Sequence, residues 1–249
     1  MLKKGHIIYC LFILNLGVLV LPMLSSCGKS DTANPTGSDV QLQVLNLSPD
    51  IFPIELNVNN LRVNSNYRYN ATPAYFYLTS IAYPLQLRST RTDDTVSRIL
   101  TRDTISFLPN TRYSLFFTGL RSEKTLRSIV TVDDTASLPP VGKGGKIRFV
   151  NAAARKADVF DVWANGVLIV KNIAFAGISN YVTLPPGNYN FRIYPTNTST
   201  TSLSELNNIT VQDGRLYTLY SKGIVGRAVT DTAAFGMAVL ANNPPKNNR

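Results

Sequence analysis

Apolar and polar side chains alternate with a period of two along most of the chain after residue 40. In Tyr189-Asn190-Phe191-Arg192-Ile193, the three apolar side chains fall on one face and the two polar ones on the other. This alternation is typical of a β-strand with one buried face. No segment after Cys27 has a sustained apolar stripe with the period of a helix, so the pattern predicts an all-β protein.

Turn residues interrupt the alternation at short intervals. Asn165-Gly166 is a strong hairpin signal, because both positions of the favoured two-residue turn need a positive φ, and Asn59-Asn60 is a weaker version of it. Residues 185–188 (PPGN) and Asp213-Gly214 are further turn signals. Many short strands joined by such turns predict antiparallel, immunoglobulin-like β-sandwiches.

The pattern occurs twice along the chain. The matching segments are 41–46 with 146–151, 55–60 with 161–166, 83–87 with 189–193, and 113–117 with 217–221. The offset between partners stays between 104 and 106 residues. A constant offset over several segments indicates an internal duplication.

The duplication sets the domain limits. We expect two tandem β-sandwich domains, at residues 40–135 and 146–241, of which the first is the more diverged copy. The segment 136–145 (ASLPPVGKGG) is rich in Pro and Gly and predicts a linker. The polar residues 242–249 predict a frayed tail.

Residues 1–26 have the three zones of a secretory signal peptide: a basic start, an apolar run and small residues before Cys27. The apolar run is shorter than the roughly 20 residues that a membrane-spanning helix needs. Residues 24–27 (LSSC) resemble the lipobox of bacterial lipoproteins. The resemblance implies cleavage before Cys27 and lipid attachment, with acyl chains such as palmitate, which makes Cys27 a membrane anchor.

The polar segment 27–39 predicts a lipidated tether that reaches on the order of 20 Å from its root. The residue after the cysteine is Gly28 rather than the Asp that retains lipoproteins at the inner membrane of enteric bacteria. We therefore expect the protein at the cell outer membrane, facing either the periplasm or the outside.

The second copy resembles the domain of unknown function 4397, which occurs in secreted bacterial proteins and often in tandem. The resemblance rests on the stretches IRFVNAAARKADVFDVWANGVLI, IAFAGISNYVTLPPGNYNFRIYP and ITVQDGRLYTLYSKG. The first copy keeps the family's Ser-Pro-Asp at residues 48–50 but lacks its Pro-Gly turn. The resemblance implies a β-sandwich and an envelope location, and it supplies no activity, cofactor or catalytic residue.

Composition narrows the possible chemistry. The only His is His6, and the only Cys besides the anchor is Cys10, both within the predicted signal peptide. The mature chain thus lacks the residues for Ser-His-Asp or Cys-His catalysis and for His/Cys metal sites. Its Glu residues, Glu55, Glu123 and Glu205, form no paired motif of the glycosidase kind. We expect no catalytic, cofactor-binding or metal site.

The formal charge of +10 becomes +8 when Lys3 and Lys4 leave with the signal peptide. The arginines are spread along the chain without a nucleic-acid motif, so we expect no nucleic-acid partner. The expected partners are the membrane, through the lipid, and glycans or other envelope proteins. Trp163 has two interpretations, a sugar-stacking platform and, preferred here, a core or half-buried strand residue.

Two sets of residues are candidates for binding and modification. Tyrosines and arginines close in sequence would form a binding patch if exposed, namely Arg62, Tyr67, Arg68, Tyr69, Tyr75 and Tyr77. Five Asp-Thr pairs precede Ala, Val or Ile and resemble the O-glycosylation acceptor of secreted Bacteroidetes proteins, although a turn Asp leading into a strand explains them equally well. Their threonines are Thr32, Thr95, Thr104, Thr135 and Thr232.

These observations predict a lipid-anchored, non-enzymatic envelope protein of a Bacteroidetes-like bacterium, in which the two domains form a binding or spacer module. The alternative is a carbohydrate-processing accessory, either glycan-binding or a carboxylate-based glycosidase. A third possibility is a stalk whose domains supply only length. Two facing carboxylates in a deep cleft would favour the enzyme, whereas an aromatic-rich face would favour binding.

Overall fold

The computed structural model describes residues 40–71, 73–78, 84–90, 99–103, 105–133, 139–140 and 142–242. In this part of the chain every regular element is a β-strand, as the alternation predicts. These residues include no helix with the length and apolar character that crossing a membrane requires. The predicted signal peptide, the tether and all of the predicted tail except Asn242 lie outside the described residues.

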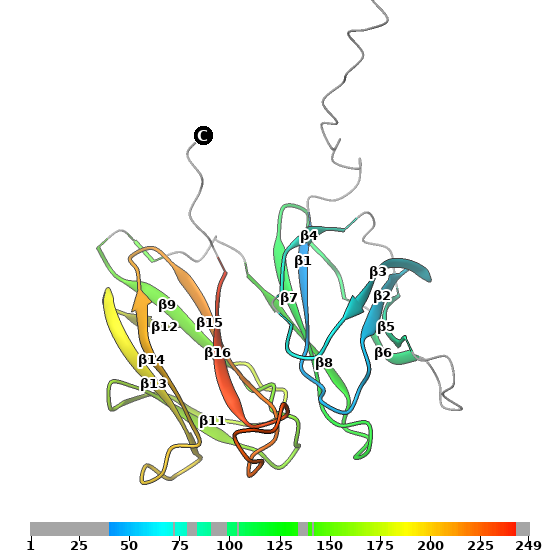
Figure 1. Ribbon diagram of the computed structural model, residues 1–249. Helices are drawn as coiled ribbons and strands as arrows, with labels where there is room; N and C mark the ends of the chain where they lie inside the picture. Colours follow the sequence, from blue (N-terminus) through cyan, green and yellow to red (C-terminus); the bar gives the residue numbers. More distant parts are fainter. Residues whose placement is uncertain are drawn as a thin grey trace, which may run out of the picture. The chain divides into compact units, whose positions relative to one another are not determined.

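The sixteen strands fall into two sets of eight, which we call the first and second repeats (Figure 1). The first repeat contains β1 (Gln41–Asn46), β2 (Ile54–Val58), β3 (Leu61–Tyr67), β4 (Phe76–Tyr77), β5 (Leu85–Ser89), β6 (Ile99–Asp103), β7 (Arg112–Thr118) and β8 (Arg127–Val132). The second contains β9 (Gly145–Val150), β10 (Phe160–Ala164), β11 (Val167–Ile173), β12 (Val182–Leu184), β13 (Gly187–Pro195), β14 (Ser204–Val211), β15 (Leu216–Lys222) and β16 (Gly236–Ala241).

The sheet topology confirms the duplication. In the first repeat the strands form sheet A, in the order β4-β1-β7-β8, and sheet B, in the order β3-β2-β5-β6. The second repeat forms sheet C, β12-β9-β15-β16, and sheet D, β11-β10-β13-β14. Adding eight to each strand number of the first repeat reproduces the second, so the chain contains two tandem β-domains with one topology.

One pair of strands in each repeat corrects the expectation of antiparallel sheets. β1 pairs with β7 in parallel, and β9 pairs with β15 in parallel, while every other pair of named strands is antiparallel among the described residues. Side chains alternate with the same period in parallel and antiparallel ladders. The alternation therefore predicts strands without fixing their direction.

The predicted hairpin turns are present. Asn165 (φ 46°) and Gly166 (φ 81°) join β10 to β11, and Asn59 (φ 51°) and Asn60 (φ 61°) join β2 to β3. Positive φ at both central residues is the geometry whose twist matches that of paired strands. The two repeats therefore use one turn type at the same place, with Asn in the position that Gly occupies in the second copy.

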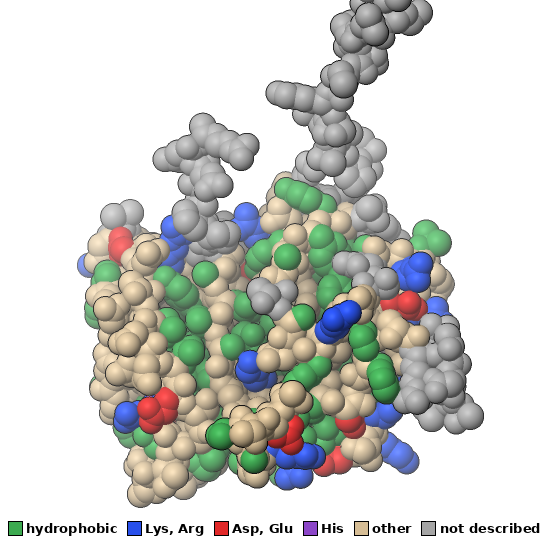
Figure 2. Space-filling view, viewed as in Figure 1, with side chains coloured by type: hydrophobic (Ala, Val, Ile, Leu, Met, Phe, Trp, Pro, Cys, Tyr) green, Lys and Arg blue, Asp and Glu red, His purple; other side chains and the backbone are tan. Residues whose placement is uncertain are grey.

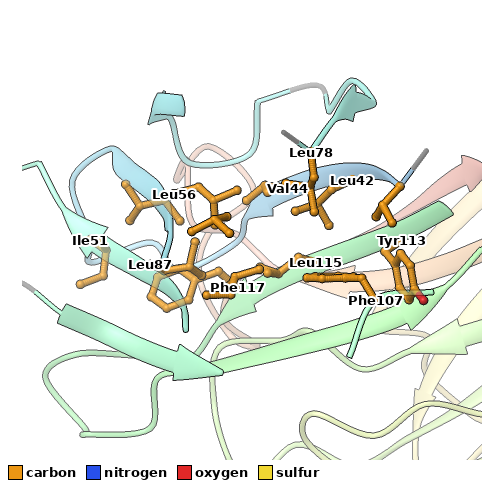
Figure 3. Packing of buried hydrophobic residues seen from close by; sticks show 14 residues of the cluster. Leu42, Val44, Ile51, Leu56, Leu78, Leu87, Phe107, Tyr113, Leu115 and Phe117 are labelled. Carbon is orange, nitrogen blue, oxygen red and sulfur yellow. The ribbon is translucent and has the colours of Figure 1, made fainter. Parts of the chain in front are cut away.

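Each repeat encloses its own apolar core. In the first repeat the core joins the inward side chains of sheets A and B, including Leu42, Leu56, Leu87 and Leu115, all at most 1% exposed (Figure 3). In the second repeat the largest buried members include Phe149, Phe160 and Phe191. These cores follow from the alternation, because every second residue of each strand points into the sandwich.

A further apolar cluster joins the two repeats. It is formed by the other faces of sheets A and C and comprises Leu45, Leu47, Phe116, Ile129, Val150, Ala152 and Tyr220, with Ala176, Ala238 and Leu240 packed against it. The rings of Phe116 and Tyr220 lie with centroids 5.5 Å apart. The central strands of sheets A and C, which are β1, β7, β9 and β15, are therefore covered on both faces and are buried almost throughout.

The predicted linker is tied to the second repeat by Asp213. Its carboxylate oxygens accept hydrogen bonds from the backbone N–H groups of Gly142 and Gly144, each at 2.7 Å. These bonds to the charged form hold the pKa of Asp213 below its usual value. The described end of the linker is therefore packed on the second repeat, and β9 begins within the segment assigned to the linker, at Gly145.

Candidate functional site

A buried polar cluster lies between the two repeats. Asp133, which follows β8 and is fully buried, accepts a hydrogen bond from Nη2 of Arg148 in β9 at 2.5 Å. The same carboxylate accepts hydrogen bonds from the hydroxyls of Tyr75 at 2.9 Å and Thr131 at 3.0 Å, and another from Ser114. A buried charge is tolerated only when it is paired and hydrogen-bonded, and Asp133 meets this requirement.

The second repeat completes the cluster around Arg148. The guanidinium donates to the carbonyl oxygen of Val132 at 2.9 Å and, through Nε, to the hydroxyl of Thr218 at 2.9 Å. Thr218 in turn donates to Oδ1 of Asn242 at 2.7 Å. The ring of Tyr181 lies 5.0 Å from the guanidinium carbon of Arg148. Arg148 therefore links the two repeats through both charge and hydrogen bonds.

Burial dominates the electrostatics of this cluster. It raises the pKa of the Asp133 carboxyl, and the nearby guanidinium of Arg148 opposes this shift. Burial and the charge of Asp133 also raise the pKa of the Tyr75 hydroxyl, which keeps Tyr75 protonated as a hydrogen-bond donor. Because these groups are buried or half-buried and hydrogen-bond to one another, we interpret the cluster as architectural.

The internal duplication shows which residues of the two repeats correspond in this cluster. Strand register aligns Gln43 with Arg148, Ser114 with Thr218, and Asp133 with Asn242. In the first repeat Nε2 of Gln43 donates to Ser114 at 2.6 Å, as Arg148 donates to Thr218 in the second. The three equivalent side chains are thus linked by hydrogen bonds in the same order in each repeat. The cation lies in one copy and the anion in the other.

An open groove on the first repeat is the strongest candidate for binding a ligand. It has a volume of about 260 Å³ and is lined by Gln41, Tyr77, Asn110 and Arg112. Gln41 and Arg112 begin the parallel strands β1 and β7, and Tyr77 lies beside Gln41 on the edge strand β4. Nε of Arg112 donates to Oε1 of Gln41 at 2.8 Å.

The groove is fixed by the chain around Tyr113. The hydroxyl of Tyr113 accepts a hydrogen bond from the backbone N–H of Leu108 at 2.8 Å, and its ring meets Phe107 edge-on with centroids 4.8 Å apart. The hydroxyl of Thr111 donates to the carbonyl oxygen of Pro109 at 3.1 Å. These contacts hold the turn that carries Asn110, so the groove is formed by well-supported backbone.

A second cavity of about 290 Å³ lies on the second repeat. It is more apolar, and its lining includes Phe160, Leu203 and Val225 together with one carboxylate, Asp158. Burial raises the pKa of Asp158. A glycosidase of the common type needs two carboxyl groups about 5 to 9 Å apart, and the described lining supplies one.

The structure divides the predicted tyrosine and arginine patch. Tyr77 is 47% exposed and lines the groove. Tyr75 belongs to the buried cluster, and Tyr67 packs against the core of the first repeat. Burial and the charge of Asp231 raise the pKa of Tyr69, which is half-buried.

The two arginines of the patch are exposed but do not join the groove. The side chain of Arg62 is 66% exposed and lies 4.0 Å from Glu55 on the neighbouring strand of sheet B. Arg68 is exposed just after β3. Of the six predicted residues, the groove contains only Tyr77.

The remaining candidate residues have the following positions. Cys27, Thr32, Thr95, Thr104 and Thr135 lie outside the described residues, so their proposed modifications stay predictions. Thr232 is exposed in a turn, where the carboxylate of Asp231 accepts a hydrogen bond from the N–H of Ala233 at 2.8 Å. This bond accounts for the Asp of that Asp-Thr pair as a turn residue and leaves the hydroxyl of Thr232 accessible.

Trp163 is half-buried and faces Tyr194 edge-on, with ring centroids 5.8 Å apart. Glu123 and Glu205 each lie beside an arginine, Arg155 and Arg192, at 3.8 and 2.9 Å. The described residues contain no group of three or more His, Cys, Asp or Glu side chains suited to a metal ion. On the face drawn in Figure 2, basic and acidic side chains are interspersed.

Sequence reasoning missed Gln41, Asn110 and Arg112, because Gln41 lies 71 residues before Arg112 and meets the other two only through the parallel pairing of β1 and β7. A signal was nevertheless present in the internal alignment. Arg112 is polar at a position where the second copy has Leu216. A charged residue in one copy opposite an apolar residue in the other marks a position that the fold itself does not require.

The strand order and the sheet topology define a tandem-repeat, all-β protein. The model of the family "Domain of unknown function (DUF4397)" matches residues 40–160 and 145–248, and the chain belongs to this family, with two copies. No curated protein matches the chain. Among solved structures, the Bacillus anthracis TIE protein is similar at 9% identity and a TM-score of 0.22, over 81% of this chain and 43% of that one. The chain thus spans less than half of that protein's length.

Proposed function

We propose that this protein is a lipid-anchored, non-enzymatic binding module of the outer membrane of a Bacteroidetes-like bacterium. The observation that carries the binding role is the open groove, whose described lining is polar and comprises Gln41, Tyr77, Asn110 and Arg112, without a carboxylate, histidine or cysteine among these four. The anchor is Cys27, and the predicted partners are glycans or other envelope proteins.

The packing between the repeats supports a module with a fixed shape. The apolar cluster of sheets A and C and the ion pair of Arg148 with Asp133 bury surface that independent domains on a flexible linker would leave exposed. A fixed arrangement suits a protein that presents its groove at a set position above a membrane. It also suits the spacer role, which remains compatible with binding.

We also propose an immunoglobulin-like classification for each repeat. Tyr113 accepts a hydrogen bond from the N–H of Leu108, five residues upstream, and Tyr217 accepts one from Gln212 in the same way at 3.0 Å. Such a tyrosine corner is a feature of immunoglobulin-like sandwiches. Each repeat also pairs its first strand with its seventh in parallel, and this pairing would distinguish subtypes of the immunoglobulin-like fold.

The anchor is tested by metabolic labelling with a palmitate analogue and membrane fractionation. The native chain should carry the label and sediment with the outer membrane, whereas Cys27→Ser should lose the label and leave the membrane fraction. An unlabelled native chain that begins elsewhere than at residue 27 would contradict the anchor. Intact-mass measurement on the same sample tests glycosylation: the native chain should carry hexose-sized increments, and Thr232→Ala should lose those of one of the five sites.

The binding role is tested with a glycan array and a pull-down on the full-length chain in detergent. We expect retention of a glycan or an envelope protein without release of shortened sugar products. Hydrolysis of a retained glycan would instead favour the carbohydrate-processing alternative, for which Asp158 in the second cavity is the first residue to replace.

A further inference from the structure

We propose that the groove of the first repeat binds the carboxylate group of an acidic sugar through Arg112, an inference that rests on the binding role proposed above and specifies its ligand. Residues Gln41, Tyr77, Asn110 and Arg112 line this groove. Their chemistry supplies a cation, an exposed aromatic ring and two amide side chains, which together match a carboxylated sugar ring.

Arg112 has its recognition atoms available. Its Nε is held by Oε1 of Gln41 at 2.8 Å, and the guanidinium carbon lies 5.8 Å from the centre of the Tyr75 ring. Among the described residues, the two terminal nitrogens have neither a carboxylate partner nor another hydrogen bond. A fixed, planar guanidinium with two free N–H edges is suited to bidentate binding of a carboxylate.

The charge of the groove favours a carboxylate over a phosphate. Among the described residues that line the groove, Arg112 is the only charged one, and it supplies one positive charge. A carboxylate carries one negative charge, whereas a phosphate monoester carries about 1.5 to 2 at neutral pH and is usually bound by several cations. A single arginine therefore balances a uronic acid group and leaves a phosphate undercompensated.

The other lining residues fit the rest of a sugar ring. Tyr77 is 47% exposed, so its ring offers an apolar face to the C–H groups of a pyranose. The amide nitrogen of Gln41 and the amide of Asn110 have no hydrogen bond to a described residue and remain free for hydroxyl groups. The volume of about 260 Å³ lies just below the range of drug-sized sites, which limits the groove to about one ring.

The backbone holds these groups in place before a ligand arrives. Asn110 has a φ of 56°, in the left-handed region where Asn is the best tolerated residue after Gly. The N–H of Gln41 donates to the carbonyl oxygen of Thr111 at 3.0 Å, which ties the start of β1 to the turn beside β7. Such preorganisation reduces the entropy lost on binding.

The second repeat has the same backbone without this set of side chains. Strand register places Lys146, Thr183 and Leu216 at the positions of Gln41, Tyr77 and Arg112. Gly214, with a φ of 68°, occupies the turn that Asn110 occupies in the first repeat. The fold therefore does not require Gln, Tyr, Asn and Arg at these four positions, and their presence together in the first repeat points to a ligand.

The test uses the full-length chain in detergent and ligand-observed saturation-transfer NMR with galacturonic acid trimer. The matched probe is the same trimer as its methyl ester, which keeps the rings and hydroxyls but lacks the charges. We expect the acid to bind roughly 10- to 100-fold more tightly than the ester, because a hydrogen-bonded charge contributes about 1.5–3 kcal/mol. Equal affinity for acid and ester would overturn the proposal.

Variants that carry residues of the second repeat should lose affinity for the acid. Arg112→Leu and Tyr77→Thr install the residues of the equivalent positions, and each should weaken binding of the acid at least about tenfold. The control is Arg62→Leu, which removes the same charge from an exposed side chain outside the groove and should leave the affinity unchanged. An equal loss in Arg62→Leu would mean that net charge alone drives binding, and the assignment to the groove would then be wrong.

The outcome separates this inference from the proposed function. Suppose that other glycans or envelope proteins bind, but that acid and ester bind equally and Arg112→Leu leaves the affinity unchanged. The binding role then holds and the groove assignment fails. If nothing binds on the array and the trimer does not bind either, both fail. The ester comparison is made on the unaltered protein, so it does not depend on how any variant folds.

Discussion

Arg148 and Asp133 are the two charged residues that the fold buries between the repeats, with side chains 6% and 0% exposed. Removing one partner of a buried ion pair leaves the other charge without compensation, which costs about 3–5 kcal/mol. Removing both at once avoids this penalty. The residues Gln43 and Asn242 at the equivalent positions show which neutral side chains the backbone accepts.

We therefore predict that Arg148→Gln and Asp133→Asn each lower the free energy of unfolding by about 3–5 kcal/mol, while the double variant loses clearly less than their sum. Urea unfolding of the four proteins of this double-mutant cycle measures the coupling. Additive losses, within about 0.5 kcal/mol, would contradict a direct interaction between the two charges.

Gly223 lies at a position where the protein has no room for a Cβ atom. Its φ is +75°, and an added Cβ would lie 2.2 Å from the carbonyl oxygen of Ala234. Gly166 has a similar φ of +81°, but no atom lies within 4 Å of its added Cβ. An Ala at Gly166 would therefore suffer only backbone strain, whereas an Ala at Gly223 would suffer both backbone strain and a direct clash.

Gly166→Ala should cost about 1–2 kcal/mol from left-handed backbone strain alone, and Gly223→Ala should cost several kcal/mol, because its clash is with backbone that cannot turn aside. Thermal or urea unfolding of both variants provides the comparison. Similar losses at the two positions would indicate that the loop around Ala234 adjusts without penalty.

At the residue scale the sequence predicts burial better than it predicts partners. Alternation identifies the inward side chains of β13, and the Asn-Gly turn at residues 165–166 follows from φ preferences alone. The groove could not be predicted in this way, because Gln41 and Arg112 come together only once β1 pairs with β7. Tyr75 and Tyr77 are two residues apart, yet Tyr75 is half-buried and hydrogen-bonds to Asp133, whereas Tyr77 is exposed and lines the groove.

Among the elements, β1 and β9 show what the pattern leaves undetermined. Both were expected as half-buried strands, but they are buried on both faces, because sheets A and C pack together. The faces of β1 and β9 that point away from the core of each repeat carry apolar residues, such as Leu45 and Val150. They also carry polar residues, such as Gln43, which give the sequence the appearance of ordinary alternation. Only the tertiary arrangement distinguishes the two cases.

The connection to β9 depends on the carboxylate of Asp213, so we expect it to weaken in acid. Asp213 has a lowered pKa in the folded chain, because its carboxylate accepts hydrogen bonds from Gly142 and Gly144. A group of this kind stabilises the folded state fully above its unfolded pKa of 3.8, and the contribution is lost as the pH falls through the lower, folded pKa.

Asp213→Asn should therefore destabilise the chain at pH 6, and the difference from the unaltered protein should shrink in acid and vanish once the folded carboxyl is protonated. Urea midpoints between about pH 2 and pH 6 measure this difference. A difference that stays constant over the whole range would show that the charge of Asp213 does not contribute to the loop.

At the scale of the whole molecule, the cluster between the sheets makes the two repeats depend on each other. Phe116 in the first repeat is fully buried against residues of both repeats. The only tryptophan, Trp163, lies in the second repeat, so its fluorescence reports on that repeat alone. A change at one residue can thus be read from the opposite domain.

We expect Phe116→Ala to cost about 3–5 kcal/mol and to shift the Trp163 fluorescence transition together with the circular dichroism transition, since both repeats unfold as one unit. Two separate transitions, with the Trp163 signal unchanged by the substitution, would show that the repeats unfold independently. Tyr77→Thr, which replaces an exposed residue that is not a member of the cluster, serves as the control and should leave both transitions in place.

The division of charge between Arg148 and Asp133 also has an evolutionary consequence. Two newly duplicated copies would have carried the same residue at matching positions, so the present arrangement of Gln43 with Asp133 in one copy and Arg148 with Asn242 in the other arose after duplication. From that point the copies ceased to be interchangeable. Deleting either one would remove the partner of the remaining charge and expose the apolar cluster that the two copies now bury together.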